Sequence, residues 1–341
     1  MPAPIPTSAG PTPKPTLKTI ARMTGLGVTT VSKALKDAPD IGAETKQRVR
    51  MTAEQIGYRP NRAGLRLRTG KTYVIALILD TEEEIMGLTT DLISGITNGL
   101  RGTPYHLAVI PYSHDQDPME PVRQVAETGM ADAIILSRTE PRDPRVRYLA
   151  EKQIPFTTHG RTELGIAHAF HDFDNSAFGR EAVDRLVCVG RTRIALIGAP
   201  SGLTYETHLR EGFLEGLSSH GLAPMPSGSV TTDSRIQEVA AQVRSLLASC
   251  APPNGFVAAS AGAGIGVVYG AEQEGLALGQ DFDVVAKQTA IDLLRWVRPG
   301  FQVVNEDFKA AGEDLAQQVL KLIEGTPPET LQTIAYPGHQ T

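Results

Sequence analysis

The sequence of 341 residues is poor in aromatic side chains and nearly free of cysteine. Aromatic residues make up 5% of the chain, and Trp296 is its only tryptophan. Cys188 and Cys250 are too few for a disulfide framework, and we expect both to be small core residues in a reducing compartment. The first residues lack the apolar stretch of a signal peptide, and no run of about 18 apolar residues follows. These absences predict a cytoplasmic protein.

The composition is otherwise that of a folded, soluble protein. Hydrophobic residues make up 41% of the chain and charged residues 21%, which excludes disorder over the whole length. The length predicts two or three domains. Residues 1–15 are rich in proline and small polar residues and are expected to form a disordered tail.

Charge is distributed very unevenly along the chain. Residues 1–72 hold 13 lysines and arginines against four acidic residues, a net charge of +9. The remaining residues hold 20 basic against 34 acidic side chains, a net charge of −14. A small basic segment joined to a large acidic one indicates an anionic partner for the first segment only. Nucleic acid is the obvious candidate, and a membrane surface would suit the same charge.

The basic segment has the pattern of three short helices. Thr16 is placed to cap a helix that ends near Thr24, and the Gly25–Gly27 break precedes a second helix over 28–36. A third helix is expected over 43–56, ending at Gly57. Two short helices around a glycine-containing turn, packed on a third, make a helix-turn-helix unit.

Beyond Tyr73 the pattern changes to short apolar runs separated by amphipathic stretches of helical length. Such alternation predicts an α/β fold with parallel sheets covered on both faces, divided into two lobes. The expected strands are 73–79, 106–112, 133–137, 155–159, 193–199, 255–260, 282–287 and 301–305.

Residues 16–61 contain the segments TLKTIA, VTTVSKAL, ETKQRV and GYRPN, in that order. With these segments the chain resembles the lac-repressor (LacI/GalR) family, and a looser likeness continues to about Pro337. The resemblance implies a three-helix headpiece at 16–60, a hinge helix or linker at 61–72, and a two-lobed core like that of periplasmic binding proteins at 73–341. That core would bind an effector and form the dimer.

The second helix is the expected reader of DNA bases. Val31 and Leu35 lie four residues apart and face the bundle, so a different stripe of the helix is free to enter a major groove. Lys33 can donate to guanine, and apolar groups can touch thymine methyls. With the resemblance, the predicted DNA contacts of the headpiece are Thr16, Leu17, Val28, Thr29, Thr30, Ser32 and Lys33. The family usually has arginine at the position of Lys33, and lysine lacks the rigid two-pronged donor. A solvated helix face is the alternative for the polar residues.

The hinge segment is also a predicted DNA contact. The resemblance implies that it orders on DNA and presses Leu67 into the minor groove, where an apolar wedge bends the duplex. Asn61 and Arg62 are predicted to contact DNA as well. Gly64 stands where the family prefers alanine and lowers the stability of this helix. An inert basic linker is the alternative.

The resemblance also implies an effector site between the lobes. In its pattern Arg180 contacts the effector and Phe213 stacks on it, and the alternatives are a surface salt bridge for Arg180 and a core ring for Phe213. The full predicted set is Asp80, Ser137, Arg161, Asp174, Arg180, Phe213, Ser260, Lys287 and Gln288.

Two departures from the family pattern bear on the effector. Ser260 and Ala261 replace the usual Asn-Asp pair, and Gln288 replaces an aspartate that commonly accepts from sugar hydroxyls. Together with Lys287, these changes predict a less negative pocket. An anionic or unusual sugar is one hypothesis, and a plain sugar bound through the neutral Gln288 is the other.

No catalytic constellation, cofactor motif or metal site is expected. His168, His171, Asp172 and Asp174 are close in sequence, but the resemblance places them at a loop and a strand end. The sequence therefore predicts a homodimeric regulator, more specifically a repressor, that binds a pseudo-palindromic operator under the control of a carbohydrate-related effector. The alternatives are a cytoplasmic solute-binding protein, and a regulator whose cleft has lost its ligand.

Overall fold

The computed structural model describes residues 15–58, 70–80, 88–113, 116–226, 228–288 and 298–338. The chain divides into two units, Met1–Thr72 and Tyr73–Thr341, and each is described by itself. The predicted tail (apart from Pro15) and most of the predicted hinge, including Asn61, Arg62 and Leu67, lie outside the described residues.

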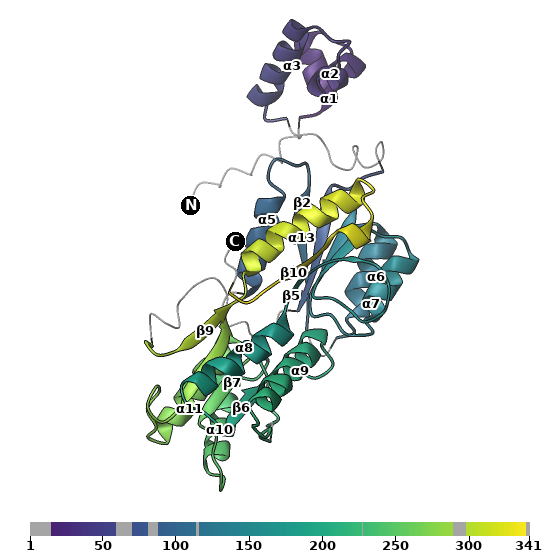
Figure 1. The fold of residues 1–341 in the computed structure, drawn as a ribbon. Coiled ribbons are helices and arrows are strands. Elements are labelled where there is room, and N and C mark those ends of the chain that lie inside the picture. The colour runs from purple at the N-terminus through teal and green to yellow at the C-terminus, as the bar shows by residue number, and fades with distance from the viewer. Residues whose placement is uncertain are drawn as a thin grey trace, which may run out of the picture. The chain divides into compact units, whose positions relative to one another are not determined.

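The first unit is a bundle of three helices, α1 (Leu17–Thr24), α2 (Val28–Leu35) and α3 (Ala43–Gln55) (Figure 1). The Thr16 side chain accepts from the amide of Thr19, and Gly25 ends α1 in the left-handed conformation with a φ of 69°, which glycine adopts without strain. The bundle core is formed by six buried side chains from the three helices: Ile20, Ala21, Val31, Ala34, Val49 and Ala53. The predicted helix-turn-helix unit is present.

The first lobe of the second unit is built on a six-stranded parallel sheet. Its strands are β1 (Val74–Asp80), β2 (His106–Tyr112), β3 (Ala133–Leu136), β4 (Phe156–His159), β5 (Ala169–Phe173) and β10 (Gln332–Ala335), in the order β10-β5-β4-β3-β1-β2. Every pairing is parallel. The carboxyl ends of all six strands therefore lie at one edge of the sheet.

Helices cover both faces of this sheet because successive strand residues point to opposite sides. In β1, Ile75 and Leu77 pack with α5 (Leu88–Gly99) and α13 (Phe308–Ile323). Ala76 and Ile78 alternate with these residues and point to the other face, where they pack with α6 (Met119–Thr128) and α7 (Pro144–Glu151). Almost the whole strand is buried, as expected of a central parallel strand.

The second lobe repeats this three-layer arrangement on a smaller scale. Its parallel sheet has the order β6-β7-β8-β9, formed by β6 (Ile194–Ile197), β7 (Gly255–Ala258), β8 (Asp283–Gln288) and β9 (Gln302–Asn305). One face packs on α8 (Asn175–Cys188) and α9 (Thr204–Ser219). The other packs on α10 (Ile236–Leu247) and α11 (Ala261–Gln273). A short 3-10 turn, Pro328–Thr330, precedes β10.

The chain passes from the first lobe to the second after β5 and returns after β9, as the ribbon shows (Figure 1). The predicted α/β class with parallel sheets in two lobes is confirmed. Two strands, β5 and β10, were not among those expected. The expectation that both cysteines lie in the core is wrong, because Cys188, the last residue of α8, and Cys250, which follows α10, are both exposed. Within the described ranges, no helix is long and apolar enough to cross a membrane.

Candidate DNA-binding surface and inter-lobe site

Helix α2 presents one face to the core and another to solvent. Val31 and Ala34 are fully buried, whereas Val28, Thr29 and Lys33 are exposed. Val28 is 41% exposed. The exposed face thus combines one apolar, one hydroxyl and one cationic group, and it can offer contacts to both thymine methyls and guanine.

The other predicted headpiece contacts are less accessible or have structural roles. Thr30 and Ser32 are half-buried on α2. Thr16 is exposed and caps α1, and Leu17 packs against the bundle core. Their contacts to DNA stay predictions.

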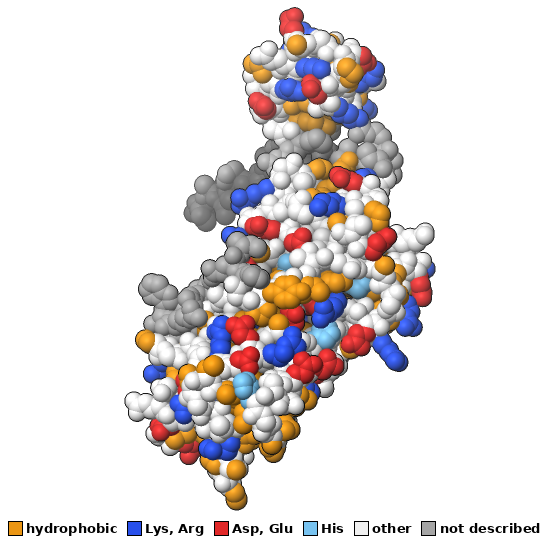
Figure 2. Space-filling model, in the orientation of Figure 1, with side chains coloured by type: hydrophobic (Ala, Val, Ile, Leu, Met, Phe, Trp, Pro, Cys, Tyr) orange, Lys and Arg blue, Asp and Glu red, His pale blue; other side chains and the backbone are white. Residues whose placement is uncertain are grey.

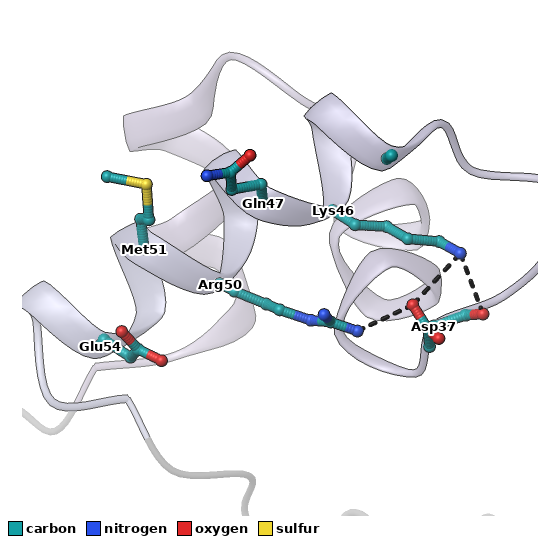
Figure 3. A pocket seen from close by; sticks show the side chains of 7 residues that line it. Asp37, Lys46, Gln47, Arg50, Met51 and Glu54 are labelled. Atoms are coloured by element: carbon teal, nitrogen blue, oxygen red, sulfur yellow. Dashed lines mark hydrogen bonds and ion pairs between the residues drawn. The ribbon is translucent and has the colours of Figure 1, made fainter.

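Acidic side chains hold three of the headpiece cations. The Lys33 ammonium lies 2.6 Å from the Asp40 carboxylate, and this hydrogen bond lowers the pKa of Asp40. Asp37 binds both Lys46, at 3.2 Å, and Arg50, at 2.8 Å (Figure 3). The hydrogen bond from Lys46 is the largest cause of the lowered pKa of Asp37.

Asp37, Lys46 and Arg50 border a surface hollow along α3, and Figure 3 draws the side chains that line it. Its further lining includes Gln47, Met51 and Glu54. Lys46 and Arg50 point away from Gln47, Met51 and Glu54 and toward Asp37. The three charged side chains therefore form ion pairs with each other at one end of the hollow.

In the second unit, polar side chains gather where strands of both sheets end. Asp80 is the last residue of β1, and Ser137 directly follows β3. Gln288 ends β8 of the other lobe and donates to the Asn305 side chain at 3.1 Å. The carboxyl ends of parallel strands are where open α/β folds bind ligands.

Arg138 joins the two lobes at this edge. Its guanidinium donates to both oxygens of Asp233, at 3.0 and 2.7 Å, and Asp233 belongs to the segment before α10 in the second lobe. Its Nε lies 3.3 Å from Asp80 in the first lobe.

Lys287, at the end of β8, is surrounded by groups that suit a cation. Its ammonium donates to the Asn175 side chain at 2.9 Å and lies 2.6 Å from Glu306. The rings of Phe173 and Tyr205 each face it, with centroids 5.3 Å away, a distance at which an aromatic face attracts a cation. The positive charge of Lys287 is therefore neutralised within the site.

Arg161 and Asp172 form a second charged pair in the first lobe, 3.2 Å apart. Burial raises the pKa of Asp172 to about 6, although Arg161 opposes the shift. Burial likewise lowers the pKa of His159 to about 4, and His159 lies 3.6 Å from Glu306 at the second crossing between the lobes. The site is thus lined by charges that are paired and partly desolvated.

Some buried hydroxyls at this edge have no hydrogen-bond partner among the described residues. They are the side chains of Ser137, Thr162 and Thr204. A buried hydroxyl without a partner is costly unless water or a ligand satisfies it.

Several predicted effector residues have structural roles, and their contacts to an effector stay predictions. Asp174 caps α8 and Ser260 caps α11. Arg180 lies on the outside of α8 and pairs with the exposed Glu215 at 2.7 Å. Phe213 is only 4% exposed and packs in the core of the second lobe. These contacts match the alternatives given above for the two residues: a surface salt bridge for Arg180 and a core ring for Phe213.

The structure brings together Asp80, Ser137, Arg161, Lys287 and Gln288 at strand ends or in the segments that follow them. It adds residues that the sequence analysis missed, namely Arg138, His159, Tyr205, Asp233 and Glu306. His159 ends a predicted strand, so its position could have been recognised from the sequence. The pairing of Arg138 with Asp233 had no sequence signal, because these residues are 95 positions apart.

The four residues considered as metal ligands have separate partners. His168 contacts the carbonyl of Ile166 and the hydroxyl of Thr158, and His171 contacts Asp314 at 2.8 Å. Among the residues that the structure describes, no group of three or more His, Cys, Asp or Glu could hold a metal ion.

A three-helix DNA-binding unit joined to a two-lobed α/β unit defines the class of helix-turn-helix transcriptional regulators with a periplasmic-binding-protein-like domain. Residues 16–61 match the model of the bacterial regulatory proteins of the lacI family, and residues 183–338 match that of a periplasmic binding protein-like domain. The chain is 32% identical to the HTH-type transcriptional regulator AglR of Rhizobium meliloti (strain 1021), over 92% of this chain and 90% of that protein. The chain belongs to the lacI family.

Solved structures agree with this assignment at the level of the fold. The lac repressor dimer bound to operator and the anti-inducer ONPF has a TM-score of 0.83 at 17% identity, covering 95% of this chain and 97% of that one. The complex of the transcriptional regulator CelR with cellobiose has a TM-score of 0.69 at 22% identity, covering 96% of this chain and 99% of that one.

Proposed function

We propose that this protein is a repressor that acts in the cytoplasm as a homodimer, without catalysis. It binds a pseudo-palindromic operator through two copies of α2 and the hinge segments 61–72. A sugar bound between the lobes sets its affinity for the operator, and the regulated genes serve carbohydrate metabolism.

The exposed face of α2 carries the DNA-binding part of this proposal. Val28, Thr29 and Lys33 are turned to solvent while the opposite side of the same helix forms the bundle core. The positive charge of residues 1–72 supplies the attraction to phosphates that operates on any sequence. A dimer pairs two such faces with two half-sites.

The charge balance at the strand ends supports a neutral sugar over an anionic one. Lys287 is expected from the sequence to leave the pocket less negative, but the Glu306 carboxylate neutralises its ammonium, which also donates to the Asn175 side chain. Arg138 and Arg161 are also paired with acids. On the face drawn in Figure 2, cationic and anionic side chains are likewise interspersed over the second unit. The unpartnered hydroxyls of Ser137 and Thr204 and the amide of Gln288 are suitable partners for sugar hydroxyls.

Selection of binding sites from random duplex DNA tests the operator and the dimer together. The full chain is expected to enrich a two-fold symmetric sequence, and enrichment of an asymmetric sequence would contradict a symmetric dimer. The selected duplex is then titrated with neutral di- and trisaccharides, sugar acids and sugar phosphates. A neutral saccharide should change the DNA affinity, and a response confined to the anionic compounds would overturn the assignment of a neutral effector.

A further inference from the structure

We propose that Arg138 is a positioning residue that holds the two lobes together through its ion pair with Asp233. This role does not depend on which effector binds. A rearrangement of the lobes has to break this ion pair, together with other contacts between the lobes such as that of His159 with Glu306.

The geometry of the pair favours such a role. Two nitrogens of one guanidinium donate to the two oxygens of one carboxylate, at 3.0 and 2.7 Å, which is the bidentate arrangement that gives arginine its directional strength. The Arg138 side chain is 27% exposed and that of Asp233 is 23% exposed, so water screens the pair only in part. Asp80, which is 3% exposed, holds the same guanidinium from the first lobe.

Arg138 is fixed in place by its own segment. Its φ of 54° is left-handed, a conformation that costs energy for a side-chain-bearing residue and often marks a functional position. Its carbonyl accepts from the Arg145 guanidinium at 2.8 Å, and Arg145 is locked in a buried pair with Asp143 at 2.7 Å. The guanidinium of Arg138 is therefore presented to the second lobe by a rigid support.

A neighbouring contact reports whether the lobes are together. The amide of Thr204, the first residue of α9, donates to the carbonyl of Thr139 at 2.9 Å. The donor belongs to the second lobe and the acceptor to the first, directly after Arg138. Because this amide loses its acceptor when the lobes part, its hydrogen exchange measures their separation.

The experiment compares amide exchange in the full-length chain and in Arg138→Gln, without DNA or sugar. The exchange of Thr204 is expected to accelerate by on the order of tenfold, whereas that of Val243, buried in α10 within the second lobe, stays unchanged. Asp233→Asn should have the same effect, and the double variant should not exceed it. Arg123→Gln is the matched control, since Arg123 pairs with Asp117 at 3.4 Å on the surface of the first lobe alone.

Three results would overturn the proposal. Unchanged exchange of Thr204 in both single variants would show that the pair does not hold the lobes. Equal acceleration at Thr204 and Val243 would show a general loss of stability. Weaker binding of a saccharide by Arg138→Gln with normal exchange of Thr204 would make Arg138 a ligand contact only.

Discussion

The ammonium of Lys33, on the exposed face of α2, lies 2.6 Å from the carboxylate of Asp40. The one cation expected to read a base is thus already bound within the headpiece. Base reading by Lys33, as proposed, requires that this ion pair be replaced, and it leaves the Asp40 carboxylate without its cation.

Asp40→Asn is therefore expected to tighten binding to the operator duplex by a few-fold, a size typical of an exposed ion pair, and to tighten binding to scrambled DNA by less. Glu54→Gln, which removes one negative charge from the exposed side of α3, is the control and should have a smaller effect. Fluorescence anisotropy with specific and scrambled duplexes measures both. An equal gain from the two variants would attribute the effect to net charge instead of to release of Lys33.

The raised pKa of Asp172 predicts a pH dependence of stability. Its pKa is about 6 in the folded chain against 3.8 as the ordinary value, so the folded state binds its proton more tightly. This group contributes stability that is full below pH 3.8 and is lost as the pH rises through about 6.

Asp172→Asn should remove this contribution. Between pH 4 and pH 7 the free energy of unfolding of the unaltered protein should fall relative to that of the variant, by about 2 to 3 kcal/mol. Urea unfolding at a series of pH values measures the difference between the two proteins. A difference that does not change with pH would contradict the assignment.

The buried pair of Arg145 and Asp143 predicts a large loss of stability when it is broken. Burial raises the pKa of Asp143, but the hydrogen bond and charge of Arg145 outweigh it and hold the pKa below its ordinary value. Arg145→Met leaves a buried carboxylate without its cation and should cost about 3 to 5 kcal/mol in urea unfolding. Arg123→Gln, at an exposed pair, should cost less than about 1 kcal/mol. Similar losses of unfolding free energy in the two variants would show that burial does not determine the cost of breaking the ion pair.

The close packing of α8 on α9 predicts that Gly179 cannot be enlarged. A Cβ at Gly179 would lie 2.6 Å from the carbonyl oxygen of Leu209 on α9, whereas the nearest atom to one at Gly262 in α11 would be the Ser260 hydroxyl, 4.0 Å away. Gly179→Ala should destabilise the chain by about 1 to 3 kcal/mol, and Gly262→Ala should be neutral or stabilising by up to about 1 kcal/mol. Thermal unfolding compares them, and similar melting temperatures would show that α8 can move away.

The sequence predicted the fold wherever local patterns determine it. The helix-turn-helix unit and the strands at 74–80 and 255–258 follow from capping residues and apolar runs. β5 was not predicted because His171 and Asp172 interrupt its apolar pattern, and their partners Asp314 and Arg161 come from other segments. Tertiary pairing here overrides the local signal.

The site was less predictable than the fold. The resemblance implies that Arg180 and Phe213 contact the effector. In the structure Arg180 pairs with Glu215, and Phe213 packs in the core of the second lobe. Lys287 was recognised, and its neutralisation by Glu306 was not. Lys287 and Glu306 meet because β8 and β9 are neighbours in one sheet, and Arg138 and Asp233 meet because the two lobes face each other. No local sequence pattern encodes either contact.

The measurement that tests the central claim most directly is the anisotropy of the selected operator duplex and of a scrambled duplex, across a salt series, with the full chain and with Lys33→Ala. The account predicts specific binding tighter than scrambled by about a thousandfold or more, and a loss of most of this ratio in Lys33→Ala while scrambled DNA is bound nearly as before. Equal affinity for both duplexes, or a Lys33→Ala variant with an unchanged ratio, would contradict base reading by the exposed face of α2.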